Sequence, residues 1–193
     1  MSENPFSTRY IRPGALEYQF DGPSSTQPLI ERLRALNWRA AIIGPHGCGK
    51  STLLATLLPV MRDAEREVLP VSLHDGERRL PQPLRQASRW HPDTLVVVDG
   101  YEQLSRWSRW RLRRSIQKYG AGLLVTAHKP TNLPILLNIE PTEARFQQIV
   151  HQLLGKRLPP INDQQLAELF ANHRGNMREA LFDLYDLYEL KQR

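Results

Sequence analysis

The sequence has a single cysteine, no long apolar run and no leader-like start. Cys48 cannot form a disulfide within the chain, so we expect a reducing compartment, the cytoplasm. No apolar run approaches the roughly 20 residues of a membrane-spanning helix, and residues 1–14 lack the apolar segment of a signal peptide. These absences argue against a disulfide-rich secreted domain and against a membrane protein.

The composition suits a medium-sized domain with a proper hydrophobic core. Hydrophobic residues make up 40% of the 193 residues and charged residues 24%, which is ordinary for a folded protein. The formal net charge is +6. This excess of positive charge fits a nucleic acid or another anionic partner, and it fits equally well a basic protein that has no such partner.

A glycine-rich stretch that follows an apolar run organises the chain. The run 40–43 predicts a buried strand, and residues 44–52 match G-x-x-x-x-G-K-[ST], the phosphate-binding loop or Walker A motif. The glycines let backbone N–H groups converge on an anion, and the next helix adds the positive end of its dipole. Lys50 would reach the β- and γ-phosphates, and Ser51 would place its hydroxyl on Mg²⁺. The predicted nucleotide-binding residues of the loop are Gly44, Pro45, His46, Gly47, Cys48, Gly49, Lys50, Ser51 and Thr52.

Apolar runs alternate with helical stripes along the rest of the chain. This alternation predicts an α/β fold, a three-layer P-loop NTPase core with a parallel sheet that is followed by a small C-terminal helical lid. The expected strands cover 40–43, 67–73, 94–99, 122–126 and 135–139. The expected helices cover 29–36, 50–58 with Pro59 at the end, 104–119, 142–155, 162–175 and 176–190, and one short helix falls within 75–92.

The same pattern divides the chain into three parts. Residues 1–24 are rich in Pro, Ser, Gly and Arg and predict an extended arm, which aromatic anchors would hold against the domain. Residues 25–141 would form the P-loop NTPase core, and residues 142–193 the helical lid. Asn176 and Glu179 have the spacing of a capping box at the start of the last helix.

A P-loop site needs an acid at the end of a neighbouring strand. Asp99 closes an apolar strand, where a Walker B aspartate would hold Mg²⁺ and its waters, so we predict that Ser51 and Asp99 bind the metal. Many P-loop ATPases of this strand spacing carry a water-activating glutamate next, but here the position is Gly100. Glu102 is the nearest carboxylate, and it would either activate water or simply cap the next helix.

Two later positions would sense the γ-phosphate. Thr126 ends a strand and could orient water with its hydroxyl, with His128 as the weaker candidate. Thr126 completes a predicted catalytic set with Lys50, Asp99 and Glu102. Arg178 lies in the first turn of the last helix, where a cation costs about a few tenths of a kcal/mol against the helix dipole unless an anion is bound. The alternative is a solvated Arg178 offset by Glu179.

In this order the motifs resemble those of the AAA+ ATPases. The match runs from about residue 29 to residue 190, with Walker A at Gly44–Thr52, Walker B at Leu95–Asp99, a sensor 1-like Thr126 and a sensor 2-like Gly-Asn-Met-Arg at 175–178. The resemblance implies ATP and Mg²⁺. It also implies a homo-oligomer or larger assembly, in which an arginine of one subunit completes the site of the next.

Residues 104–119 predict a helix with an unusually basic exposed side. Leu104, Leu112 and Ile116 share the face that would pack on the sheet. One arginine, Arg113 or Arg114, could be the finger that reaches a neighbouring subunit. Alternatively the stripe binds nucleic acid, with an indole stacked on a base, or the helix is only a solvated basic face. The stripe consists of Arg106, Arg109, Trp110, Arg113 and Arg114.

Two functions from different classes remain open. We expect an ATP-binding and ATP-hydrolysing ATPase of a regulatory or loader type, which acts as a switch in a larger assembly. Gly100 instead favours a nucleotide-binding scaffold or a nucleic-acid-binding protein with little or no hydrolysis. A nucleotide or small-molecule kinase is disfavoured, because the lid after residue 142 is acidic and amphipathic rather than rich in arginine.

Overall fold

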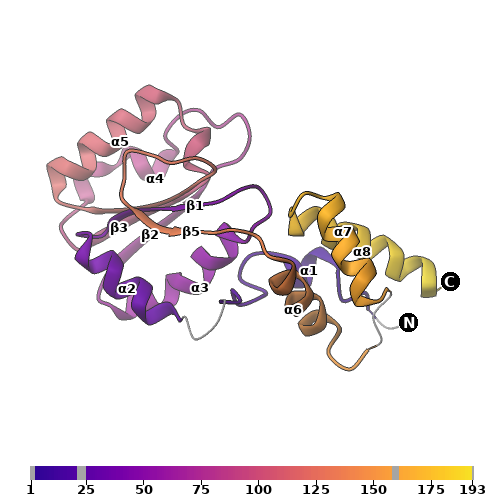
Figure 1. Ribbon diagram of the computed structural model, residues 1–193. Helices are drawn as coiled ribbons and strands as arrows, with labels where there is room; N and C mark the ends of the chain where they lie inside the picture. The colour runs from indigo at the N-terminus through magenta and orange to yellow at the C-terminus, as the bar shows by residue number, and fades with distance from the viewer. Residues whose placement is uncertain (1–2, 21–24, 158–160, 193) are drawn as a thin grey trace.

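A computed structural model describes residues 3–20, 25–157 and 161–192 of the chain. It has two lobes, an α/β core and a smaller helical lid, with the N-terminal segment running between them (Figure 1). The core is a parallel sheet covered by helices on both faces, which confirms the predicted α/β, three-layer fold class. No helix in these described ranges is long and apolar enough to cross a membrane.

The sheet has five parallel strands in the order β2-β3-β4-β1-β5. β4 therefore lies between β1, which precedes the glycine-rich loop, and β3, which ends in Asp99. In this register Ser72 pairs with Asp99 and Ile42 with Thr126, so the carboxyl ends of the strands form one edge. The strands are β1 (Arg39–Ile43), β2 (Glu67–Ser72), β3 (Thr94–Asp99), β4 (Gly122–Ala127) and β5 (Ile135–Asn138).

Alternate residues of the central strands face opposite layers, as the period of two along a strand requires. Ile42 and Leu124 pack under α2 (Thr26–Ala35) and α3 (Lys50–Asp63). Ile43 and Val125 pack under the other layer, which holds α4 (Gln82–Arg85), the short 3-10 helix η1 (Ala87–Arg89) and α5 (Arg106–Tyr119). Both faces of β1 and β4 are therefore buried, which explains their continuous apolar sequences.

Two helix ends in the core differ from the sequence prediction. α3 continues through Pro59 to Asp63, so the expected end at Pro59 is wrong. Pro59 is exposed, and the burial of Met61 in the next turn offsets the hydrogen bond that the proline cannot make. The basic helix starts at Arg106 rather than at Leu104, because the 3-10 turn η2 (Tyr101–Gln103) precedes it and Ser105 caps it by accepting from the Ser108 N–H.

The lid consists of α6 (Glu143–Leu154), α7 (Asp163–Asn172) and α8 (Met177–Gln192) around a separate apolar cluster. Thr142 caps α6, and Asn162 forms a reciprocal capping box with Gln165 at α7. α7 stops at Asn172 and not at Gly175 as expected, because the chain turns through left-handed backbone at Arg174 and Gly175.

Only half of the predicted capping box at the start of α8 is present. The Asn176 Oδ1 accepts from the Glu179 N–H at 3.4 Å, and the return bond from the Glu179 side chain is absent among the described residues.

The N-terminal arm contacts both lobes. It contains a short helix, α1 (Thr8–Ile11), so it is not extended throughout as expected. Phe6 is fully buried in the lid cluster, where its ring meets Tyr188 edge-on with centroids 6.0 Å apart. Tyr18 belongs to the core cluster, and its N–H donates to the Thr56 hydroxyl on α3. The described part of the arm thus ties the lid to the core.

Candidate functional site

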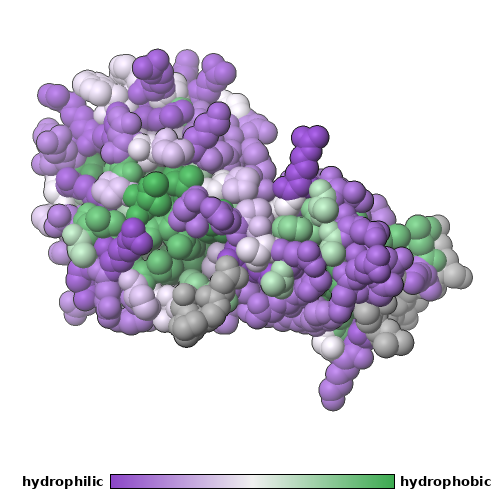
Figure 2. All heavy atoms as spheres, viewed as in Figure 1, coloured by the Kyte–Doolittle hydropathy of each residue, from purple (hydrophilic) through white to green (hydrophobic). Residues whose placement is uncertain are grey.

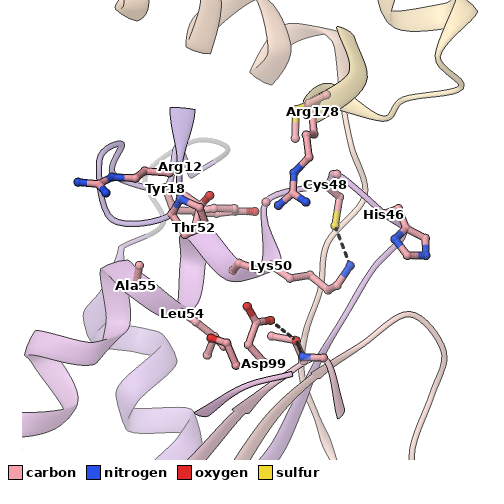
Figure 3. A pocket seen from close by; sticks show the side chains of 18 of the residues that line it. Arg12, Tyr18, His46, Cys48, Lys50, Thr52, Leu54, Ala55, Asp99 and Arg178 are labelled. Carbon is pink, nitrogen blue, oxygen red and sulfur yellow. Dashed lines mark hydrogen bonds between the residues drawn. The ribbon is translucent and has the colours of Figure 1, made fainter. Parts of the chain in front are cut away.

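A cavity of about 990 Å³ lies where the carboxyl ends of the strands, the arm and the lid meet. Its walls include the glycine-rich loop, the end of β3, the arm from Thr8 to Gln19 and the start of α8. Figure 3 shows this arrangement: Lys50 and Asp99 face the space from the core, Tyr18 from the arm and Arg178 from the lid. Four segments that are distant in sequence therefore build one site.

The glycine-rich loop folds tightly around the Lys50 ammonium. Gly47 and Gly49 have φ of +69° and +96°, a left-handed backbone that only glycine adopts without strain. Lys50 Nζ donates to the carbonyl oxygens of Gly44 at 2.8 Å and Pro45 at 2.6 Å. Burial lowers the pKa of Lys50 from its ordinary value, since the charged form loses solvation. The loop therefore holds a partly desolvated cation beside the cavity. An anion in the cavity could replace the two carbonyl oxygens as the partner of this cation.

The lone cysteine contributes packing to this loop rather than reactivity. Cys48 is fully buried, and a side chain at Gly44 would come within 2.6 Å of its sulfur. Burial raises the pKa of the Cys48 thiol, which keeps it protonated and weakly nucleophilic.

Asp99 and Thr126 form one hydrogen-bonded unit at the ends of β3 and β4. The Thr126 hydroxyl donates to Asp99 Oδ1 at 2.5 Å and accepts from the Gly100 N–H at 2.9 Å. Thr126 is almost fully buried. Both hydrogen-bonding functions of its hydroxyl are thus used to orient the carboxylate and the turn after β3. In this structure Thr126 positions Asp99 rather than projecting a free hydroxyl into the cavity.

Gly100 cannot be replaced by a glutamate without rearrangement. Its φ is +81°, and a Cβ at this position would lie 2.8 Å from the Leu73 carbonyl oxygen. A side chain at residue 100 would therefore both strain the backbone and collide with the Leu73 carbonyl. A second carboxylate beside Asp99 must come from another residue.

Glu102 supplies a carboxylate at the same wall. One of its oxygens lies 3.1 Å from His128 Nε2, and the other is buried without a hydrogen-bond partner among the described residues. The His128 ring in turn lies against the His46 ring, with centroids 3.5 Å apart. Burial lowers the pKa of His128, although the Glu102 charge opposes this shift. A second polar cluster on the cavity wall thus consists of Glu102, His128 and His46. Glu102 does not cap the next helix, because Ser105 fills that role.

The lid reaches the loop through the start of α8. A Cβ on Gly47 would lie 1.8 Å from the Asn176 side-chain oxygen, which shows how closely the two segments approach. Arg178 is exposed, points into the cavity in Figure 3 and has no carboxylate partner among the described residues. Glu179 therefore does not neutralise it. Arg178 stands at a helix N-terminus facing the Lys50 side of the cavity, where an anion would relieve its electrostatic cost.

Sequence reasoning missed the residues that the arm and α6 contribute. Tyr18 is buried, packs near Gly49 and lies under the Arg145 guanidinium at 5.2 Å from its ring centroid. Arg145 is itself buried on α6 and donates to the Glu140 carbonyl. The aromatic residues of the arm indicated anchoring, but no motif linked Tyr18 to Arg145, because the two residues are far apart in the sequence and are in contact only in the folded structure.

The structure brings most of the predicted site residues together. Ser51 and Thr52, both half-buried, line the cavity with the loop, and Asp99, Glu102, Thr126 and Arg178 line it from the other sides. The basic residues of α5 do not line it. Three of them, Arg106, Arg109 and Arg113, instead line a second cleft that shares Glu102 and His128 with the first.

Comparison with family models and with curated proteins gives no match to the sequence. Solved structures do match. DnaA from Aquifex aeolicus bound to AMPPCP has a TM-score of 0.56 at 13% identity over 94% of this chain and 66% of that chain. A DNA replication initiation factor has a TM-score of 0.54 at 15% identity over 86% of this chain and 63% of that chain. NtrX from Brucella abortus in complex with ADP has a TM-score of 0.56 at 15% identity over 86% of this chain and 50% of that chain.

These identities are low enough that the likeness establishes the fold and nothing finer. The chain spans about half to two thirds of the length of the structures that it matches. DnaA and NtrX are AAA+ ATPases, and their matches cover 94% and 86% of this chain. The chain therefore has the AAA+ P-loop NTPase fold.

Proposed function

We propose that this chain binds ATP in the cavity between core and lid. The observation that carries the proposal is the convergence of Lys50, Asp99 and Arg178, from three elements, on one space beside a glycine-rich loop that opens a helix. Two cations beside a glycine-rich loop that opens a helix form an arrangement typical of polyphosphate sites. The structural neighbours with AMPPCP and ADP support a nucleotide as the ligand.

The residues at the end of β3 fit a magnesium ion as part of the proposal. Ser51 and Asp99 offer a hydroxyl and a carboxylate, which are the oxygen donors that Mg²⁺ prefers. The described residues contain no group of three or more His, Cys, Asp or Glu that could hold a metal by themselves. This fits an ion that is completed by phosphate oxygens and waters. When bound, it would neutralise charge on the β- and γ-phosphates.

Hydrolysis, in this proposal, uses Glu102 in place of the missing glutamate after Asp99. One of its oxygens is buried and has no hydrogen-bond partner among the described residues, so it would have to turn toward the cavity to accept a proton from water, while His128 holds the other oxygen. Thr126 keeps Asp99 in place. We propose slow turnover, since Glu102 lies within the 3-10 turn η2 rather than directly after Asp99, and its side chain is tethered to His128.

We propose that the biological role is that of a regulatory or loader-type switch in an oligomer or larger assembly. Arg178 and the close approach of Asn176 to Gly47 would make the lid position depend on the nucleotide. The mass of the protein in solution, measured with and without a non-hydrolysable ATP analogue, tests the assembly. An unchanged monomer under both conditions would argue against nucleotide-dependent assembly.

Lys50→Ala tests ATP binding. Because Lys50 is the cation of the phosphate loop, we expect the variant to show no binding at ATP concentrations that saturate the wild type, in a fluorescent-nucleotide titration. Lys156→Ala, which removes an exposed lysine of the lid, is the matched control and should bind normally. Unchanged ATP affinity in Lys50→Ala would refute the assignment.

Glu102→Gln tests hydrolysis separately from binding. If Glu102 is the general base, phosphate release should fall about 100-fold or more, while ATP affinity changes little. Glu31→Gln, at an exposed position on α2, should release phosphate at the wild-type rate. No phosphate release from the wild type would instead favour the nucleotide-binding scaffold. Full activity in Glu102→Gln would exclude Glu102 as the general base.

A further inference from the structure

Helix α5 presents a surface of uncompensated positive charge. It carries five arginines and one lysine within Arg106–Tyr119. In the described residues, no Asp or Glu side chain forms an ion pair with any of these cations, whereas Arg66 and Arg9 elsewhere do have such partners. On the face seen in Figure 2, hydrophilic side chains cover the region over α5. Cations this close repel each other unless an anion lies between them.

Part of this charge lines a cleft of about 570 Å³ between α5 and the loop after β4. Arg106, Arg109, Arg113 and Lys129 face it, against one carboxylate, Glu102, which His128 already engages. Arg109 is held in place, since its Nε donates to the Leu104 carbonyl at 2.8 Å and its Nη2 to the Glu102 carbonyl at 2.9 Å. A concave, pre-positioned cluster of cations is a site for phosphate groups.

Two tryptophans of the same helix are exposed. Trp107 is 62% exposed and Trp110 is 51% exposed, which is unusual for the largest side chain in a protein with a well-formed core. Trp110 is four residues after Arg106 and three before Arg113, so it stands on the same helix face as the cleft arginines. Arg114 lies over its ring at 5.7 Å from the centroid. An exposed aromatic ring among arginines offers a stacking surface for a base.

From this placement we infer that α5 and its cleft bind the backbone of a single-stranded nucleic acid, with Trp110 stacked on an unpaired base. Phosphates occupy the arginine cleft, and bases turn outward onto the indoles. The inference does not rest on ATP binding. It is tested without nucleotide, so a failure to bind nucleic acid would leave the proposed ATP binding untouched. A failure to bind ATP would likewise leave this inference untouched.

The exposed indoles favour a single-stranded nucleic acid over two other partners that could use the positive charge of α5. An arginine that completes the nucleotide site of a neighbouring subunit needs one cation at a subunit boundary, and it explains neither the remaining arginines nor the exposed rings. An acidic protein surface would pair with the arginines but leaves Trp107 and Trp110 without a role. Unpaired bases use both the charge and the rings.

The first test measures the binding of a fluorescein-labelled oligo-dT of about 20 nucleotides by anisotropy in low salt. We expect Arg106→Ala/Arg113→Ala to weaken binding at least tenfold. The slope of log K against log salt should become shallower by about 1.4, since each lost phosphate contact accounts for about 0.7. Arg62→Ala/Lys156→Ala removes the same charge from exposed positions on α3 and in the lid and should stay within about twofold of the wild type.

The second test separates stacking from charge. Trp110→Ala should weaken oligo-dT binding about 5- to 100-fold with an unchanged salt slope, and Trp110→Phe should retain most of the affinity. Oligo-dT should quench the tryptophan fluorescence of the wild type more than that of Trp110→Phe. Circular dichroism checks that each variant is folded, and Trp110 is exposed enough that its loss should not unfold α5.

Three outcomes would overturn the inference. The first is no oligo-dT binding by the folded wild type in low salt. The second is an equal loss in Arg62→Ala/Lys156→Ala, which would show attraction to net charge alone. The third is binding of a duplex of equal length as tightly as the single strand, with no effect of Trp110→Ala. Loss of ATP turnover in Arg106→Ala/Arg113→Ala without any nucleic-acid binding would assign these arginines to a neighbouring subunit instead.

Discussion

At residue 100 the backbone turns through a φ of +81°, and the Leu73 carbonyl closes the space where a side chain would begin. This one residue determines where the carboxylate of the proposed hydrolysis can lie. Asp99 is oriented by Thr126 and is followed by Gly100 instead of a glutamate. The next carboxylate along the sequence belongs to Glu102, which lies within the 3-10 turn η2. The chemistry of the site thus depends on a local backbone conformation as much as on which side chains are present.

Gly100→Glu should therefore destabilise the protein and should not restore a Walker B glutamate. The left-handed backbone costs a non-glycine residue about 1–2 kcal/mol, and the contact with the Leu73 carbonyl adds to it. Urea unfolding measures the effect. Gly76→Ala is the control, since Gly76 has a φ of +90° but nothing lies within 4 Å of an added Cβ. Its free energy of unfolding should fall less than that of Gly100→Glu. A Gly100→Glu variant as stable as the wild type with faster phosphate release would contradict this account.

Among the elements, α3 shows how packing overrides a local signal. Pro59 predicts an end to the helix, yet the helix continues for one more turn, because Met61 is buried beneath it in the core cluster. Pro59 itself is exposed. The helix that begins at the glycine-rich loop therefore carries a proline that weakens its last turn without breaking it.

Pro59→Ala should stabilise the protein by about 1–3 kcal/mol, because it restores a backbone donor and removes the clash of a proline within a helix. The midpoint of thermal unfolding is the measurement, and it should rise while ATP binding stays unchanged. Arg62→Ala, in the same turn, should move the midpoint little. A lower midpoint for Pro59→Ala would mean that the proline ring has a packing role that its exposure does not reveal.

Across the whole molecule, the N-terminal arm decides how the lid meets the core. Phe6 completes the lid cluster, and Asn4 donates to the Tyr185 carbonyl and to Glu189 on α8. Further along, Tyr18 packs on the core and faces the cavity. The cavity is thus closed on one side by a segment from the opposite end of the chain, and the position of the lid depends on it.

Phe6→Ala should destabilise the lid by about 3–5 kcal/mol, because it empties a fully buried site in the lid's only described apolar cluster. We expect faster proteolysis within 142–192 and weaker ATP binding, with the core still folded by hydrogen exchange. Arg9→Ala, at a largely exposed position on α1, is the control and should cost less than about 1 kcal/mol. Equal protease resistance in both variants would show that the arm does not hold the lid.

The elements and the glycine-rich loop follow from the sequence alone because their signals are local. The apolar run before Gly44, the glycine spacing of the loop and the β-branched stretch ending at Asp99 each lie within about ten residues and determine backbone conformation directly. The two wrongly predicted helix ends, at Pro59 and at Gly175, have the opposite cause. Where α3 and α7 end depends on tertiary packing and on the backbone turn that follows, which local sequence signals do not reveal.

Only the tertiary structure decided which side chains meet. The strand order puts Thr126 against Asp99, the lid brings Arg178 and Arg145 to the cavity, and the loop after β4 places His128 on Glu102. None of these pairs is close in sequence, and each forms because burying the core and lid clusters fixes the distant segments in place. The sequence alone determined that a glycine-rich loop follows the first strand and where that loop starts, whereas packing determined which acid, which cations and which aromatic ring surround it.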